Sequence, residues 1–324
     1  MSQTSVASLA DIRAARKRLA GLALHSPLVE CHAGDEVCRT FLKLENLQSI
    51  GAFKIRPVGN AVLTRPAGSL GAGLYTLSSG NSAIALAWLA RRLGVPATAV
   101  VGEGASPVKL AGLEALGAHI VHLPSDAWWR AVEAGGLADQ PGEYIDAARE
   151  QAAIAGNGTL GMEILEDLPD VEAIFTPLGS GALACGIACA VRALKPGVRV
   201  IACELDTARP FSAALAAGRP VRTASDPGFV SGVGFHSLLT EMWPLTRDLI
   251  NGVVTVSLAE VAATIGVLAR RNKIIAEGAG AIPVAAALSA RHPYRRVCAV
   301  VSGGNLDPAA LGTILAGGVP ARSG

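Results

Sequence analysis

The chain has 324 residues and a formal net charge of +2; 51% of its residues are hydrophobic and only 4% are aromatic. This near-neutral balance gives no charge signal for nucleic acid or for an anionic membrane surface, so we expect neither as a partner. No run of about 18 uninterrupted apolar residues occurs, and no membrane-spanning helix is expected. The length predicts one large or two medium domains, and the abundant Gly and Ala are typical of a helix-rich α/β protein.

Six cysteines are spread along the chain without a CxxC pair or another metal-ligand spacing. This pattern indicates reduced, buried thiols and predicts no metal site. The first ten residues are polar and lack the apolar stretch of a secretion signal, so we expect a cytoplasmic protein.

The first elements in chain order are two helices separated by short extended pieces. A capping box at Ser8 to Asp11 opens a helix to about Leu22, and a second helix follows Lys54 and runs towards Leu63. Strands and helices then alternate, which is typical of parallel βαβ units. The expected strands are 74–77, 97–101 and 119–123, and the expected helices are 79–93, 107–116 and 125–134.

A second alternating series fills the rest of the chain. Its first helix is predicted at 148–168, with a possible break at Gly156 to Gly158, and 223–240 is expected to be irregular. The expected strands are 171–177, 198–204 and 297–302, and the expected helices are 182–194, 210–217, 257–271, 279–290 and 307–316. We therefore predict a small α/β domain at 72–146 and a large domain made of 1–71 and 147–324.

Lys54 lies at a loop-to-helix junction, directly behind Gly51 and Phe53. Desolvation and the positive potential of a helix start both disfavour the ammonium form, and a neutral amine is what Schiff-base chemistry needs. The chain has only six Lys against 22 Arg, which favours a use for the amine. On this stretch alone, an ordinary solvent-exposed lysine at a helix start is still the better explanation.

The glycine-containing loop from Gly179 to Leu183 lies between a predicted strand and a predicted helix. Its backbone N–H groups can bind a phosphate at the helix start. Gly179, Gly181 and Ala184 also fit a loosened dinucleotide fingerprint, with Glu204 as the ribose contact. A turn without a ligand is the third possibility, and the strand-loop-helix context favours some phosphate ligand.

Three further polar positions follow strands or begin helices. The turn Ser78 to Ser82 can bind a carboxylate, although an ordinary helix cap explains it better when it is taken alone. Ser302 follows the last strand, where a hydroxyl can bond a ring nitrogen, or where a glycine-rich turn is simply needed. Glu277 is an acid at a helix start, where the helix dipole stabilises it.

Taken together and in order, six segments resemble the motifs of the fold-type II pyridoxal-phosphate enzymes. The segments are KLENLQSIGAFKIR, SSGNS, AGNGTLGMEIL, PLGSGALACGI, AEGAGA and VSGGNLD. They are most similar to the branch of serine/threonine dehydratases and serine racemases, and dehydratases of the hydroxyectoine-utilisation type are equally similar. The resemblance spans about Lys43 to Asp307. It implies two parallel-sheet domains of the open twisted, tryptophan-synthase-β-like type, with the cofactor in the cleft between them, and a homodimer.

The resemblance also implies a role for each motif residue. Lys54 would hold pyridoxal 5'-phosphate through a Schiff base, with Phe53 and Glu277 near the cofactor ring. Asn81 would bond the ring hydroxyl and Ser302 would face the ring nitrogen. The phosphate would be bound by the backbone of Gly179, Ser180, Gly181, Ala182 and Leu183.

The substrate carboxylate would lie at Ser78, Ser79 and Asn81. The implied activity is β-elimination from a β-hydroxy amino acid such as threonine or serine, giving a 2-oxo acid and ammonia, with Lys54 taking the α-proton. Ser79 is the position that the racemase branch uses as a second acid and base, so an amino-acid racemase is the alternative. A dinucleotide-binding oxidoreductase or a non-catalytic binding protein leaves the Lys54 stretch unexplained.

Several positions depart from the family pattern. Ser82 replaces a usual His, Pro57 a usual Gly and Asn157 a usual Gln. These departures bear on which amino acid is the substrate more than on the cofactor. Some relatives bind a cation with an acid at the position of Pro210, so we expect no metal there.

Overall fold

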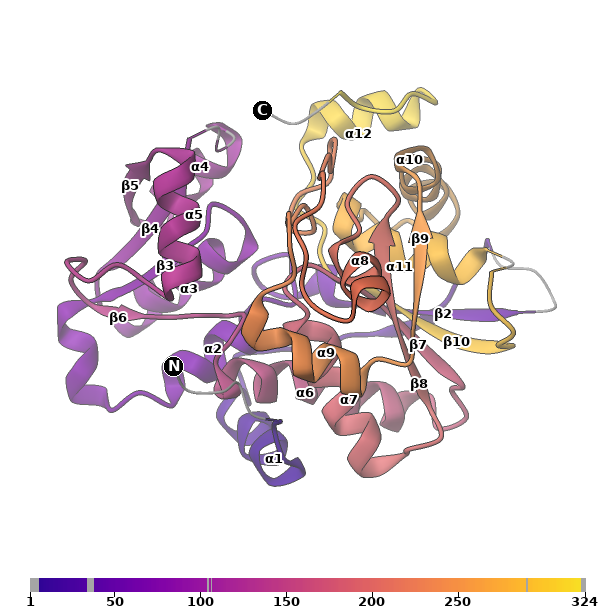
Figure 1. The fold of residues 1–324 in the computed structure, drawn as a ribbon, viewed down its shortest axis with the longest axis horizontal. Helices are drawn as coiled ribbons and strands as arrows, with labels where there is room; N and C mark the ends of the chain where they lie inside the picture. Colours follow the sequence, from indigo (N-terminus) through magenta and orange to yellow (C-terminus); the bar gives the residue numbers. More distant parts are fainter. Residues whose placement is uncertain (1–5, 34–37, 104, 106, 290, 322–324) are drawn as a thin grey trace.

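The structure is a computed structural model that describes residues 6–33, 38–103, 105, 107–289 and 291–321. Two β-sheets organise the chain, and each carries helices on both faces (Figure 1). All strand pairs are parallel except β1 with β2. The predicted α/β class with two parallel sheets is therefore confirmed.

The larger sheet has six strands. In spatial order they are β1 (Leu28–Glu30), β2 (Arg39–Leu44), β10 (Arg296–Val301), β7 (Ala173–Pro177), β8 (Arg199–Leu205) and β9 (Gly252–Val256). Alternate residues of β10 enter two different cores, because successive side chains of a strand point to opposite faces. Val297, Ala299 and Val301 face the core under α10 and α11, whereas Cys298 and Val300 face the core under α6 and α7.

The helices around this sheet cover both of its faces. Their bounds are α1 (Leu9–Arg18), α6 (Gln151–Asp167), α7 (Ala182–Leu194), α8 (Pro210–Ala217), α9 (Trp243–Leu249), α10 (Leu258–Val267), α11 (Gly278–Leu288) and α12 (Pro308–Leu315). A π-helix at Leu268–Asn272 continues α10, and 3-10 turns occur at Glu45–Leu47 and Thr240–Met242. None of the helices in the described ranges combines the length and apolar character needed to cross a bilayer.

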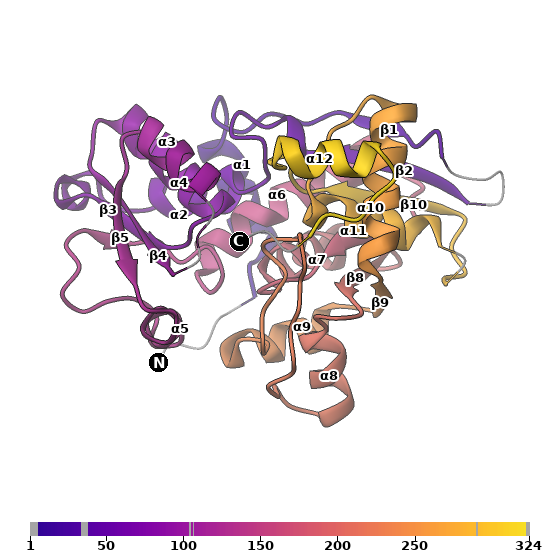
Figure 2. The same cartoon turned by 90° about the horizontal axis from the view of Figure 1, so that it is seen from above.

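The smaller sheet has four parallel strands and lies at the left of Figure 1. In spatial order they are β5 (His119–Leu123), β4 (Ala97–Gly102), β3 (Leu74–Leu77) and β6 (Glu143–Tyr144). Figure 2 shows α3 (Asn81–Leu93) and α4 (Pro107–Ala115) on one side of the sheet and α5 (Ser125–Ala134) on the other. A 3-10 turn at Ala67–Ala72 follows α2 (Ile55–Leu63) and leads into this sheet. The sheet lies inside the segment expected to form the small domain, and the division at 72 and 147 stays a prediction.

The structure differs from the sequence prediction in a few elements. The helix α1 ends at Arg18 rather than near Leu22, and β6, α9 and β9 were not predicted. The expected break in α6 is wrong, because the helix runs through Gly156 and Gly158 without interruption. A Cβ on Gly156 would collide with the backbone oxygen of Arg56, and one on Gly158 would lie 2.7 Å from the side chain of Ile12. These glycines permit close helix packing instead of ending the helix.

Candidate active site

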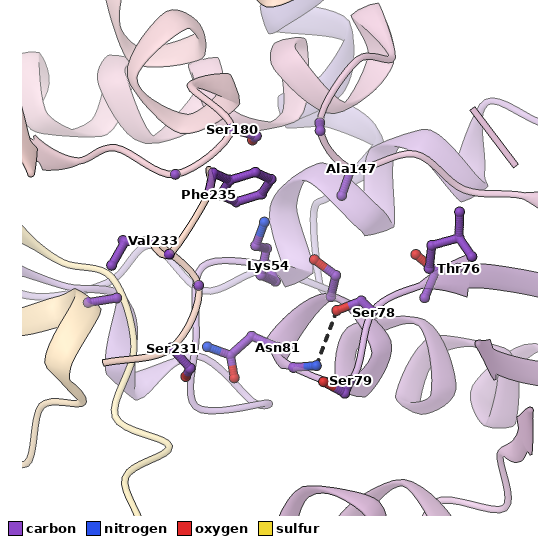
Figure 3. A pocket seen from close by; sticks show the side chains of 18 of the residues that line it. Lys54, Thr76, Ser78, Ser79, Asn81, Ala147, Ser180, Ser231, Val233 and Phe235 are labelled. Atoms are coloured by element: carbon purple, nitrogen blue, oxygen red, sulfur yellow. Dashed lines mark hydrogen bonds between the residues drawn. The ribbon is translucent and has the colours of Figure 1, made fainter. Parts of the chain in front are cut away.

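A cavity of about 550 Å³ lies between the two sheets. It opens beyond the carboxyl ends of β3, β7 and β10, where ligands bind in parallel α/β sheets. Every cofactor or substrate residue predicted from the sequence lines it, except Ala182, which is buried at the start of α7. Figure 3 shows Lys54, Ser78, Ser79, Asn81 and Ser180 around this space.

Lys54 directly precedes α2, and its amine extends into the cavity, 4.9 Å from the centre of the Phe53 ring. Desolvation lowers the pKa of Lys54 to about 8, while the negative charges of Asp146 and Glu277 act in the opposite direction. The predicted desolvation is present, but the charged neighbours oppose the shift instead of adding the expected positive potential. A solvent-exposed lysine, the simpler explanation, does not describe this side chain.

The loop before α7 needs its glycines. Gly181 has φ +90°, a left-handed conformation that side chains other than Gly rarely adopt. A Cβ there would lie 2.6 Å from the Thr246 methyl group, and a Cβ on Gly179 would collide with the backbone oxygen of Gly232. The loop therefore presents bare backbone to the cavity at the N-terminus of α7, the arrangement that suits a phosphate.

The turn after β3 does not cap α3 through a side chain. Gly80 occupies the cap position, and the Ser78 hydroxyl accepts a hydrogen bond from the Gly80 N–H at 3.1 Å (Figure 3). Ser79 lines the cavity, and its hydroxyl makes no hydrogen bond within the described part of the chain. The ordinary-cap explanation of this turn is therefore wrong.

Asn81 has both ends of its amide engaged. It donates to the carboxylate of Glu277 at 2.7 Å and accepts from the side-chain amide of Asn305 at 2.8 Å. Asn305 also donates to the backbone oxygen of Ile50 at 2.9 Å. Burial raises the pKa of Glu277 to about 7, although the bond from Asn81 and the charges of Lys109 and Lys54 lower it. Near neutral pH, both the protonated and the ionised form of Glu277 are therefore populated.

Ser302 directly follows β10, the last strand, and is only 2% exposed. Its backbone oxygen accepts from the N–H of Phe53 at 2.9 Å, and the next residue, Gly303, accepts from the N–H of Glu277 at 3.0 Å. A Cβ on Gly303 would collide with the Glu277 carboxylate. The end of β10 therefore connects the Lys54 loop to Glu277.

Glu204 has a different role from the one that a dinucleotide would require. Its carboxylate accepts from the N–H groups of Phe211 and Ser212 at 2.8 and 3.0 Å and from the Ser212 hydroxyl at 2.7 Å. These bonds anchor the start of α8, and Glu204 is fully buried there. The described residues also contain no group of three or more His, Cys, Asp or Glu arranged to hold a metal ion.

Sequence reasoning missed several residues around the cavity. Asn305 donates its side-chain amide to Asn81, and it could have been found as the asparagine of the VSGGNLD segment. Lys109 lines the cavity and is one of only six lysines. Asp146, Trp129 and Phe235 also line it, but they lie outside the glycine-rich motifs and carried no signal of their own.

Comparison with known proteins identifies relatives over most of the chain. The family described as "Pyridoxal-phosphate dependent enzyme" matches residues 21–303. L-threonine ammonia-lyase of Geobacter sulfurreducens is 35% identical over 287 residues, which cover 87% of this chain and 71% of that protein. Serine racemase of Oryza sativa subsp. indica is 30% identical, over 93% of this chain and 91% of that protein.

Solved structures give a matching result. The maize serine racemase has a TM-score of 0.85 at 30% identity, covering 95% of this chain and 96% of that chain. The T.th. threonine deaminase has a TM-score of 0.80 at 33% identity, covering 93% of this chain and 99% of that chain.

Proposed function

The chain belongs to the pyridoxal-phosphate dependent enzyme family, and from this premise we propose that it is an ammonia-lyase acting on a β-hydroxy amino acid such as threonine or serine. Its cofactor is pyridoxal 5'-phosphate, and its products are a 2-oxo acid and ammonia. One observation carries the proposal. A single cavity combines the Lys54 amine, whose pKa is lowered, a glycine-containing loop at the start of α7 that suits a phosphate, and the uncharged Ser302 just after the last strand. The homodimer and cytoplasmic location expected from the sequence form part of the same proposal.

The residues present fit this cofactor. Gly179 and Gly181 leave room for a phosphate at the start of α7, and a Cβ at either position would fill that room. Lys54 would supply the amine that holds the cofactor. When bound, pyridoxal phosphate provides an electron sink for the bond that breaks at the substrate Cα.

Lys54 is the group that we propose moves the α-proton. At a pKa of about 8, roughly a tenth of its amines are neutral at pH 7, against fewer than about one in a thousand for an ordinary lysine. With the substrate bound, the neutral amine of Lys54 would accept the proton from the substrate Cα. The aromatic ring of Phe53 and the protein around the cavity limit its contact with water.

The substrate carboxylate is proposed to lie at the turn Ser78 to Ser82. Hydroxyl groups and the N-terminus of the 13-residue helix α3 face the cavity there, and both favour an anion. Ser302 carries no charge, so it would not hold a proton on the ring nitrogen of the cofactor. Elimination needs that proton least, because the departing hydroxyl carries the electrons away.

Racemisation is the second candidate, and one observation favours it. The Ser79 hydroxyl lines the cavity without a hydrogen-bond partner among the described residues, and it does not cap α3. It can therefore exchange a proton with the substrate if it lies across the cofactor from Lys54. In that case the mirror-image amino acid accumulates instead of a 2-oxo acid.

The test uses the purified protein, the Lys54→Ala variant and the surface control Lys17→Ala, each with added pyridoxal phosphate. The parent and the control should show a yellow absorption band that borohydride fixes onto the chain, and Lys54→Ala should not. Threonine and serine are then supplied, and the 2-oxo acid, ammonia and both amino-acid enantiomers are measured. A parent that stays colourless and converts neither amino acid would refute the proposal.

A further inference from the structure

Aromatic side chains gather in the cavity although they are scarce in the chain. The sequence has 6 Phe, 3 Tyr and 4 Trp in 324 residues. Five of these line the one cavity that holds Lys54: Phe53, Trp128, Trp129, Tyr144 and Phe235. The proposed function uses Phe53 alone, and neither threonine nor serine brings enough apolar surface to need the other four.

Two of the rings meet across the cavity from different parts of the chain. Trp129 lies on α5, beside the small sheet, and Phe235 lies on the irregular segment between α8 and α9. Their ring centres are 6.0 Å apart at 75°, an edge-to-face contact. A Cβ on Gly179 would lie 3.3 Å from the Phe235 ring, so this ring packs beside the phosphate loop. Figure 3 shows the Phe235 ring projecting into the cavity that Lys54 enters.

Trp128 and Tyr144 extend this pair of rings along the small sheet, and the four side chains together form an aromatic wall of the cavity. Trp128 meets Trp129 edge-to-face at 5.0 Å and donates its indole N–H to the backbone oxygen of Val100 at 3.0 Å. Because that donor is already used, Trp128 offers the cavity only its ring. Val132 and Tyr144 pack into the same apolar cluster, and burial raises the pKa of the Tyr144 phenol, which therefore stays neutral.

One charged group of the cavity lining, Arg149, is already paired. Arg149 lines the cavity, but it donates to the Asp146 carboxylate at 2.8 Å and to the Val132 backbone oxygen at 2.7 Å. Its Nε lies 3.5 Å from a Glu241 carboxylate oxygen. An acidic substrate side chain that bound Arg149 would have to compete with these contacts, whereas an apolar one leaves them in place.

We propose that the preferred substrate is a β-hydroxy amino acid with an aromatic ring on its β-carbon, represented by β-phenylserine. The ring packs against the cavity side of the aromatic wall, beside the edge-to-face pair of Trp129 and Phe235. This inference rests on the proposed ammonia-lyase activity and specifies its substrate. The bonds Cα–H and Cβ–O break and water leaves. One water then hydrolyses the released enamine to phenylpyruvate and ammonia, so no oxidant or reductant is needed.

The first experiment compares kcat/KM of the cofactor-loaded protein for threo-β-phenylserine, threonine and serine. A hydrophobic pocket discriminates by about 10 to 200-fold for a single methylene, so phenylserine should exceed threonine by at least about tenfold. Trp129→Leu should lower kcat/KM for phenylserine about tenfold, chiefly through KM, and should lower the threonine value by a clearly smaller factor. The control is Trp88→Leu, which removes an indole outside the cavity, beneath Arg92, and should change neither value.

A binding measurement tests the same wall without turnover. L-Phenylalanine and L-2-aminobutyrate lack the β-hydroxyl and cannot undergo the elimination, so calorimetry gives their affinities directly. Phenylalanine should bind at least about tenfold more tightly, and Trp129→Leu should remove most of that difference.

The possible outcomes distinguish failure of the aromatic-substrate inference from failure of the proposed ammonia-lyase activity. Conversion of threonine or serine with no preference for phenylserine overturns the aromatic-substrate inference and leaves the ammonia-lyase intact. Equal losses for all substrates in Trp129→Leu also overturn it, because a structural defect would act in that way. If no β-hydroxy amino acid yields a 2-oxo acid, the ammonia-lyase proposal fails, and equal binding of phenylalanine and aminobutyrate would then refute the aromatic site independently.

Discussion

Replacing Arg56 by methionine should destabilise the protein strongly, although Arg56 lies outside the cavity. The side chain is 1% exposed and lies two residues after Lys54. It donates to both carboxylate oxygens of Glu45, at 2.8 and 2.9 Å, and to both of Glu163, at 2.7 and 2.8 Å. Burial pushes the pKa of Glu45 upward, but the charge and hydrogen bonds of Arg56 reverse this and hold it below its usual value.

The expected cost follows from the charges that Arg56→Met leaves behind. Breaking a buried ion pair by removing one partner costs about 3 to 5 kcal/mol, because the remaining charge stays desolvated. Glu45, which is fully buried, is that charge here. The matched control is Arg16→Met, which removes an equally bidentate pair with Glu166 whose side chains are 42% and 45% exposed. Such an exposed pair is worth about 0 to 1 kcal/mol.

Urea unfolding at pH 7 measures both changes as differences in the free energy of unfolding. The double variant Arg56→Met with Glu45→Gln should recover part of the loss, since a neutral amide replaces the unpaired carboxylate. The reasoning is refuted if Arg56→Met costs no more than Arg16→Met, or if Glu45→Gln recovers nothing.

Four further predictions concern the cavity. The rate at which pyridoxal phosphate attaches should rise about fivefold from pH 7 to 8 and level off near pH 9, because the neutral fraction of Lys54 saturates above its pKa of about 8. Stopped-flow absorbance measures this rate, and continued tenfold increases per pH unit would indicate an ordinary lysine. Gly181→Ala should cost about 1 to 2 kcal/mol in urea unfolding and weaken phosphate binding, whereas Gly197→Ala, with open space around it, should be neutral within about 0.5 kcal/mol. Because the pKa of Glu277 is raised to about 7 in the fold, its contribution to the stability of the cofactor-free protein is present below pH 4.5 and is lost as the pH rises to about 7. In Glu277→Gln, the free energy of unfolding should no longer fall by about 3 kcal/mol over this pH range. Asn305→Ala removes two hydrogen bonds and should weaken pyridoxal-phosphate binding by about five- to tenfold in a fluorescence titration, and unchanged affinity would mean that Asn305 does not support the cofactor site.

Local patterns in the sequence were enough to predict most of the α/β framework. Strands such as 74–77 and 297–302 are apolar runs bounded by turn residues, and buried parallel strands have that composition. The capping box predicted at Ser8 opens a helix in the structure, and the helix predicted from Ser257 also begins there with a capping box. By contrast, the edge strand β9, most of whose residues are half-buried, was not predicted.

The continuous helix α6 shows what a local pattern does not contain. Gly-Asn-Gly is a typical helix break by composition. Whether it breaks the helix depends on the neighbouring helices. Gly156 packs against α2 and Gly158 against α1. A Cβ on Gly186 of α7 would lie 2.5 Å from the Cβ of Asn157. These close approaches decide the outcome, and they become visible only once all the helices are placed.

The candidate site was predictable as a set of motifs, but its electrostatics were not. The sequence places Lys54 at a helix start and therefore suggests positive surroundings. In the fold, its charged neighbours are Asp146, which follows β6, and Glu277, which precedes α11. Neither is close to Lys54 in sequence, so the sign of the local field could not be derived from the residues beside it.

The loop that presents Lys54 depends on the last strand of the large sheet. Phe53 donates its N–H to the backbone oxygen of Ser302, and the N–H of Gly304 donates to the backbone oxygen of Gly51, both at 2.9 Å. These bonds can form only when β10 is inserted between β2 and β7. Because burial is what lowers the pKa of Lys54, a reactive amine requires this long-range pairing. The chemistry of Lys54 is thus a property of the assembled sheet, and the short motif that contains the lysine is not sufficient to produce it.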